Sequence, residues 1–229
     1  MNNKKRVAVI IVAAGVGKRM GRGIAKQYLE LKEEPILLHT LRKFDLPEID
    51  EIIVVIKKED KDLFESRILN KIDFKIKTVY GGKERIDSVR NGMESLSNNI
   101  DIVLIHDGVR PFVSKDIIRE NIIVAREKGA ALTAVKSKDT VKIVEKDLVA
   151  NTPNREKIYL AQTPQSFKKD ILIRAYDELE SSEGITDDSM VVERLGEKIY
   201  IVQGNYDNIK ITTEEDLFIG ERILEKNGI

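Results

Sequence analysis

The chain contains no cysteine and only two histidines, His39 and His106. Without thiols it can form no disulfide, no thiolate nucleophile and no zinc site built on cysteine. Two histidines are also too few for a histidine-rich metal centre. These absences exclude several classes of enzyme. A chain without cysteine suits a reducing compartment, so we expect a cytoplasmic protein.

An excess of charge is also lacking, because 39 basic residues balance 39 acidic ones. No overall field therefore draws the chain to nucleic acid or to an anionic membrane. No stretch approaches the roughly 20 consecutive apolar residues of a membrane-spanning helix. We expect neither nucleic acid nor membrane as a partner, and any basic site must be local.

The beginning of the chain has two interpretations. Residues 4–6 are basic and precede the apolar run VAVIIVAA, as in a signal peptide. The same run leads directly into a loop with distinctive chemistry, so we expect a buried first strand over residues 6–12.

That loop is the most informative segment of the sequence. Residues 13–17 are small, and the cations Lys18, Arg19 and Lys26 follow them. Small residues after a strand let backbone N–H groups approach phosphates, and the cations add charge at the same place. The spacing does not match the dinucleotide fingerprint, because this chain has Met20 where the fingerprint has its third glycine. It does not match a P-loop either. We predict that this segment binds a polyphosphate. The alternative is a flexible loop that happens to be basic.

Along the chain, apolar runs rich in β-formers alternate with amphipathic stretches. This alternation predicts one α/β domain over residues 1–229, with a mostly parallel sheet and helices on both faces. The expected strands are 6–12, 51–56, 74–79, 101–105 and 130–135, and the expected helices are 36–44, 59–69, 85–96, 114–127, 168–180, 187–195 and 213–226.

The alternation stops between residues 136 and 165. Two short alternating runs, VKIV and LVANT, flank a polar Glu-Lys-Asp turn. They predict a β-hairpin without an obvious place in the main sheet. Residues 136–156 are either a surface excursion or an arm that packs against a second subunit. An isolated hairpin is marginally stable in water, which favours the arm and a homodimer.

Ligands of open α/β sheets bind beyond the carboxyl ends of the strands. Four segments that follow predicted strands are rich in glycine, charge or hydroxyl groups, and they are 13–26, 81–85, 106–111 and 136–140. We therefore expect a site at this edge of the sheet.

Arg19 and Lys26 are the strongest catalytic candidates, because fixed cations stabilise charge that gathers on a reacting phosphoryl group. Asp107 can hold a substrate hydroxyl, orient Arg110 or approach Mg²⁺; the alternative is a turn cap. Both histidines are expected to be structural, since no serine or cysteine nucleophile stands in a recognisable motif.

The remaining candidates carry weaker signals. Gly82 and Ser88 belong to a glycine turn that either reads a base or ribose or is an ordinary left-handed turn. Thr186 precedes two aspartates in a helix-start pattern. Lys210 is a lone cation on a predicted short strand.

The order of these motifs resembles the 2-C-methyl-D-erythritol 4-phosphate cytidylyltransferase family from residue 6 to about 226. The matching strings are AAGVGKRM, KQY, GGKERIDSV, HDGVRPF, KDT, TPQSF, ITDD and DNIKIT. The resemblance implies a Rossmann-like nucleotidyltransferase fold, a homodimer joined by the β-arm, and CTP and a polyol phosphate as substrates. It also implies Mg²⁺, or another divalent cation, held mainly by the CTP phosphates, with no protein metal site.

Carried over by motif, the resemblance assigns a role to each site residue. Arg19, Lys26, Arg155 and Lys210 would be catalytic, with Arg155 and Thr140 supplied by the partner's arm. The expected substrate-binding residues are Ala13, Ala14, Gly15, Gly82, Ser88, Asp107, Gly108, Arg110, Thr140 and Thr186.

Two departures from the family pattern and two rival functions remain. Lys83 stands where the family often has an acidic residue, and Gly108-Val109 stands where many members have two alanines. The rivals are a ribitol-5-phosphate cytidylyltransferase and a nucleotide-binding regulatory module without turnover. The surplus cations Lys26, Arg155 and Lys210 argue against the regulatory module.

Overall fold

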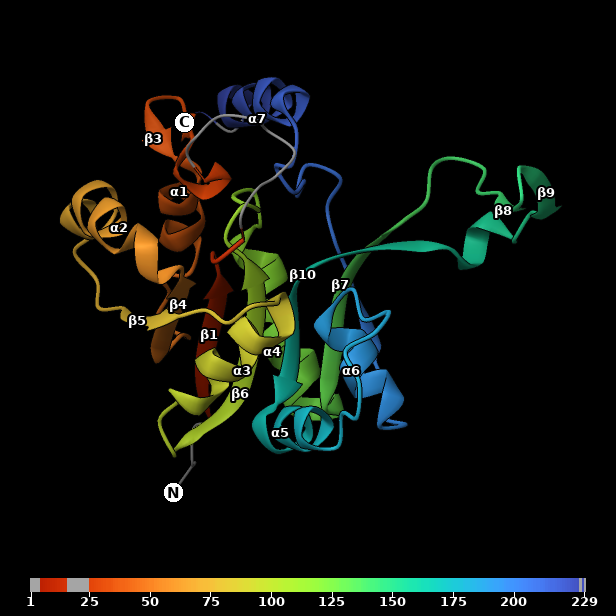
Figure 1. Ribbon diagram of the computed structural model, residues 1–229, viewed down its shortest axis with the longest axis horizontal. Helices are drawn as coiled ribbons and strands as arrows, with labels where there is room; N and C mark the ends of the chain where they lie inside the picture. Colours follow the sequence, from red (N-terminus) through yellow and green to blue (C-terminus); the bar gives the residue numbers. More distant parts are fainter. Residues whose placement is uncertain (1–4, 16–24, 227, 229) are drawn as a thin grey trace.

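The protein is described by a computed structural model that covers residues 5–15, 25–226 and 228. Its centre is a seven-stranded sheet with the order β11-β7-β10-β6-β1-β4-β5 (Figure 1). Every neighbouring pair is parallel except the two pairs that β10 forms with β6 and β7. The strands are β1 (Arg6–Val12), β4 (Glu51–Ile56), β5 (Lys77–Tyr80), β6 (Ile100–Asp107), β7 (Ala130–Lys136), β10 (Tyr159–Lys168) and β11 (Tyr200–Gln203).

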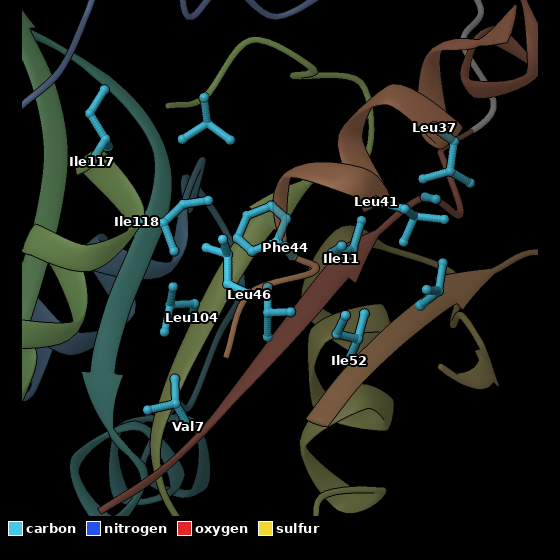
Figure 2. Close-up of a cluster of buried hydrophobic side chains, with 14 of the residues drawn as sticks. Val7, Ile11, Leu37, Leu41, Phe44, Leu46, Ile52, Leu104, Ile117 and Ile118 are labelled. Carbon is cyan, nitrogen blue, oxygen red and sulfur yellow. The ribbon is translucent and has the colours of Figure 1, made fainter. Parts of the chain in front are cut away.

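Both faces of the sheet are buried, as the continuous apolar sequence of β1 requires. Side chains of a strand alternate between faces, so Val7, Val9 and Ile11 join one core cluster while Ala8 and Ile10 join the other. The helices on the first face are α1 (Ile36–Lys43), α2 (Lys61–Arg67) and α4 (Lys115–Lys128), and Figure 2 shows how side chains of α1 and α4 meet those of the sheet. The helices on the second face are α3 (Arg85–Glu94), α5 (Lys169–Asp177) and α6 (Asp188–Arg194).

A third, smaller core lies beyond the carboxyl ends of the strands. It joins α7 (Glu214–Lys226) to the β-ribbon of β2 (Glu30–Leu31) and β3 (Glu34–Pro35) and to the loop after β6. Ile211, Phe112 and Ile223 are among its buried members. The short 3₁₀ helices of the chain are η1 (Lys26–Tyr28), η2 (Lys58–Asp60), η3 (Leu69–Lys71) and η4 (Arg155–Lys157).

The hairpin predicted within the arm segment, residues 136–156, is present as antiparallel strands β8 (Ile143–Glu145) and β9 (Leu148–Asn151). Its two turn residues, Lys146 and Asp147, both have positive φ, which matches the twist of a two-residue hairpin turn. Figure 1 shows it projecting away from the sheet beyond β7 and β10. Its two strands pair with each other and with no strand of the main sheet among the described residues.

The mostly parallel α/β sheet with helices on both faces is confirmed, and strands 6–12 and 51–56 have the predicted bounds. The prediction was wrong for residues 74–76, since β5 begins at Lys77, and it missed β10 and β11. β10 returns directly from the arm beside β7. A connection without a crossover helix can join only antiparallel neighbours, so this strand lies outside the βαβ alternation.

No helix within the described part of the chain combines the length and the apolar character needed to cross a membrane.

Candidate active site

Three of the four predicted segments meet at the carboxyl edge of the sheet and enclose two adjoining cavities. The first cavity lies between the loop after β1, the glycine turn before α3 and the loop after β6. It is lined by Val12, Ala13, Ala14, Gly15, Lys26, Gln27, Gly82, Lys83, Glu84, Arg85, Ser88, Asp107, Val109 and Lys210. The second cavity is lined by Arg85, Asp107, Arg110, Ala161, Gln162, Thr163, Gln165, Thr186, Asp187 and Lys210. Arg85, Asp107 and Lys210 line both.

The wall formed by the β1 loop is held by its backbone. Ala13 donates its N–H to the carbonyl of Val55 over 2.8 Å, and the buried amide of Gln27 donates to the carbonyl of Ala13 over 2.7 Å. Gln27 therefore fixes η1 against β1 and brings the neighbouring Lys26 to the first cavity. Arg19, the other predicted catalytic cation of this segment, lies outside the described residues.

The glycine turn is shaped by close approach. Neither Gly81 nor Gly82 has a positive φ, so the left-handed turn considered for this segment is not what the glycines provide. A Cβ on Gly81 would lie 2.5 Å from the Cβ of Ala14, and one on Gly82 would lie 2.3 Å from the Cβ of Asp87. Any larger residue would push the turn out of the first cavity.

Ser88 stabilises this turn from within α3. Its hydroxyl accepts the N–H of Gly82 over 3.2 Å and donates to the carbonyl of Glu84 over 3.1 Å. Glu84 and Asp87 form a capping box at the start of the helix. Ser88 lines the first cavity, but its hydroxyl proton is already used by the protein.

Asp107 is the acidic centre shared by the two cavities. Its Oδ2 lies 3.1 Å from the Nζ of Lys210 and 3.7 Å from Nη2 of Arg110, and its Oδ1 lies 3.9 Å from Nε of Arg85. Burial would raise the pKa of Asp107, but these three cations outweigh it and hold that pKa well below its usual range. Asp107 is therefore ionised, and an acceptor on Oδ1 remains available to a ligand.

His106 is structural, as predicted. It is fully buried with its ring edge-on to Phe44, and burial lowers its pKa to about 4. Its Nε2 lies 2.9 Å from the carbonyl of Arg110, which can only accept, so Nε2 carries the proton. Nδ1 then accepts from the hydroxyl of Thr163, and that hydroxyl in turn accepts the N–H of Asp107 over 3.1 Å.

His39 is structural as well. Its ring Nε2 lies 2.7 Å from the carbonyl of Leu31, and burial lowers the pKa of its imidazole.

The two other candidates of the β6 loop differ in their exposure to the cavities. Arg110 lines the second cavity and is anchored by a 2.6 Å hydrogen bond to the carbonyl of Asn208. Gly108 lines neither cavity; it packs against Ala13, and its carbonyl accepts the hydroxyl of Thr40. Its backbone holds the loop on α1, and its predicted place at the border of the substrate site stays a prediction.

Besides Ala161 and Gln162, four lining residues of the second cavity were missed by the sequence analysis, and these are Arg85, Thr163, Gln165 and Asp187. Each stands inside a string that had been singled out, but the strings alone do not show which side chain faces inward. Asp187 is also the N-cap of α6, accepting the N–H of Met190 over 3.0 Å. Thr186, a predicted site residue, is exposed and lines the same cavity.

Thr140 and Arg155 lie on or beside the arm and line neither cavity of their own chain. Both are exposed. Arg155 donates through Nη1 to the carbonyl of Lys138 at the base of the arm over 3.2 Å.

Within residues 5–15, 25–226 and 228, no group of three His, Cys, Asp or Glu side chains could hold a metal ion. The cavities present a single shared aspartate amid cations. Mg²⁺ commonly binds one or two carboxylates and the phosphates of a substrate, and this donor set fits an ion brought in on a polyphosphate.

A mostly parallel α/β sheet whose carboxyl edge carries a small-residue loop and two adjoining cavities lined with cations fits a nucleotidyltransferase. Residues 7–226 match the family model described as "2-C-methyl-D-erythritol 4-phosphate cytidylyltransferase". The chain belongs to this family.

Two curated relatives carry the same name as this family. The Clostridioides difficile protein named 2-C-methyl-D-erythritol 4-phosphate cytidylyltransferase is 51% identical over 220 residues, which cover 95% of this chain and 93% of the relative. The protein of that name from Clostridium botulinum strain Langeland is 47% identical over 226 residues, covering 96% and 97%.

Solved structures share the fold as well. The 4-diphosphocytidyl-2C-methyl-D-erythritol synthase of Anaerococcus prevotii superposes with a TM-score of 0.87 at 42% identity, covering 97% of both chains. The enzyme of Francisella tularensis gives a TM-score of 0.81 at 33% identity, covering 96% of this chain and all of its own. These likenesses confirm the Rossmann-like fold and the enzyme class, and they do not favour the ribitol-phosphate alternative.

Proposed function

We propose that the protein transfers the cytidylyl group of CTP to 2-C-methyl-D-erythritol 4-phosphate, giving 4-diphosphocytidyl-2-C-methyl-D-erythritol and pyrophosphate for isoprenoid synthesis by the non-mevalonate route. The observation that carries this proposal is the pair of adjoining cavities that share Asp107, Arg85 and Lys210. Two substrates bound side by side across a shared cationic boundary are what a group transfer between two phosphates requires.

In this proposal the first cavity receives CTP. Ala13, Ala14 and Gly15 lie along the nucleotide, with Lys26 at its phosphates. Gly15 leaves open space, since nothing lies within 4 Å of a Cβ built on it, and that space suits a close phosphate. The part of this cavity beside Gly82 and Ser88 receives the pyrimidine base. Arg19, by family resemblance, joins Lys26.

The second cavity receives the polyol phosphate. Asp107 Oδ1 accepts a substrate hydroxyl, and Thr163 and Thr186 also line this cavity. Arg110 and Lys210 supply positive charge around the phosphate of this substrate.

The reaction balances without a redox partner or a protein nucleophile. A phosphate oxygen of the polyol attacks the α-phosphorus of CTP, a new P–O bond forms, and the bond to the β-phosphate oxygen breaks. Pyrophosphate leaves with that electron pair. Lys26 and Lys210 stabilise charge on the phosphoryl oxygens as it builds up, an effect worth about 3–4 kcal/mol for a well-placed donor. Bound to the phosphates, Mg²⁺ would neutralise further charge.

We further propose a homodimer joined through residues 136–156, in which Thr140 and Arg155 of each arm complete the partner's site. The support is the exposure of four large apolar side chains on the hairpin, Ile143, Val144, Leu148 and Val149. A two-stranded hairpin with such side chains in water is marginal by itself. The guanidinium of Arg155 has the planar fork that suits a phosphate. The proposed location is the cytoplasm, which a cysteine-free chain suits.

Pyrophosphate release tests the function directly. The protein is assayed with CTP, ATP, GTP and UTP, each combined with methylerythritol 4-phosphate or with ribitol 5-phosphate. We expect fast release only with CTP and methylerythritol phosphate, because buried polar groups left unpaired by a wrong base discriminate strongly. Equal rates with CTP and ATP, or a preference for ribitol phosphate, would contradict the proposal.

A further inference from the structure

Arg85 stands where the two cavities join, and a buried carboxylate on another helix holds it. Its Nη1 and Nη2 donate to the two oxygens of Asp188 over 2.9 and 2.6 Å. Asp188 is fully buried in the first turn of α6. The hydroxyl of Tyr176, on α5, donates to Oδ1 of Asp188 over 2.7 Å. Three helices of one face of the sheet thus meet in one polar cluster, Arg85–Asp188–Tyr176.

This cluster decides what Arg85 can offer to the cavities. A bidentate pair uses both terminal nitrogens of the planar guanidinium. Although burial opposes the charge of Arg85, Asp188 raises the pKa of its guanidinium, so the cation persists. On the side of the cavities, its Nε lies 3.9 Å from Oδ1 of Asp107. The Nη1–Nη2 edge of this guanidinium is therefore occupied by Asp188 and is not available to a phosphate.

We propose that Arg85 is a positioning residue for the second substrate, locked by Asp188 and Tyr176 so that it orients Asp107 instead of binding a phosphate. Lys210 and Arg110 both lie against Oδ2 of Asp107, whereas Arg85 is the cation beside Oδ1. Contacts from both sides fix the plane of the carboxylate and leave Oδ1 aimed at the hydroxyl of the polyol. This inference rests on the proposed function for the identity of that substrate.

The first test removes the hydrogen bond between Tyr176 and Asp188. Tyr176 lines neither of the two cavities. Tyr176→Phe deletes the hydroxyl that holds Asp188, and Tyr200→Phe on β11 is the matched control. One hydrogen bond contributes about 0.5–1.5 kcal/mol, so we expect the KM for methylerythritol phosphate to rise roughly twofold to tenfold in Tyr176→Phe. The KM for CTP and the kcat should stay within about twofold of the wild type.

The second test asks whether the effect passes through Asp107. In an Asp107→Asn background, adding Tyr176→Phe should no longer change the KM for methylerythritol phosphate, because coupled residues are not additive. An effect of the same size in both backgrounds, an equal rise in both KM values, or no rise at all would overturn the positioning role.

A third readout needs no turnover, so it separates this inference from the proposed function. The double variant Arg85→Gln/Asp188→Asn replaces the ion pair by a neutral hydrogen-bonded pair, which avoids leaving a buried charge alone. Carbon-13 NMR follows the carboxylate of Asp107, which faces Lys210, Arg110, His106 and Arg85. We expect its pKa to rise in the double variant. An unchanged titration would refute the role of Arg85, whereas a wild-type enzyme inactive with every substrate pair would refute only the proposed function.

Discussion

Replacement of Lys26 should lower kcat much more than it lowers the affinity for CTP. It lines the first cavity from η1, and its charge is needed more when the phosphoryl group gains negative charge than in the ground state. Lys26→Ala should lower kcat by about 10²–10³-fold while CTP affinity falls less. Calorimetry with CTP beside steady-state kinetics measures both, with Lys58→Ala on η2 as control. A raised KM at unchanged kcat would refute the catalytic role.

His106 should make stability depend on pH. Its folded pKa of about 4 lies below the ordinary value of 6.5, so the unfolded chain binds the extra proton between these values. Stability then falls as the pH drops through this window, by about 2 kcal/mol from pH 7 to pH 5. Urea unfolding at both pH values should show this loss in the wild type.

The matched variant for this prediction is His106→Gln, which can still donate to the carbonyl of Arg110 and does not titrate. Its stability loss between pH 7 and pH 5 should be smaller than that of the wild type by about the same 2 kcal/mol. An identical loss in both proteins would mean that His106 is not the group responsible.

At the scale of elements, replacing either of two glycines beside the first cavity by alanine should have different effects on stability and on CTP binding. A Cβ on Gly81 would meet Ala14 and Ser88 at 2.5 and 2.7 Å, whereas one on Gly15 would meet open space. Gly81→Ala should therefore cost about 1–3 kcal/mol of unfolding free energy through overpacking. Gly15→Ala should leave stability unchanged and weaken CTP binding. Thermal unfolding and calorimetry on both variants decide; equal stability of the two would contradict the packing argument.

At the scale of the whole molecule, the arm predicts complementation between inactive variants. If Arg155 serves the partner's site, a heterodimer of Lys26→Ala and Arg155→Ala chains has one site with both wild-type residues and one with neither. Mixing the two inactive proteins under conditions of subunit exchange should restore up to about half of the activity per heterodimer. A mixture that stays inactive despite proven exchange would show that Arg155 does not act across the interface.

The sequence by itself determined the alternating α/β order, the buried first strand, the arm and the segments that carry the chemistry. Apolar periodicity and glycine and charge clustering are local signals, and local signals are sufficient for these features. β1 and β4 therefore have the predicted bounds, and Lys26 and Asp107, which lie on two of the predicted segments, line the same cavity.

Only the tertiary structure decided the place of β10, the packing role of Gly108 and the burial of Asp188 against Arg85. Arg85 and Asp188 are 103 positions apart in the sequence, and no periodicity predicts that their side chains meet. Such pairings depend on how α3 and α6 pack on one face of the sheet. The direction in which a polar side chain points is set by the partner that packing brings to it, because a buried charge must find one.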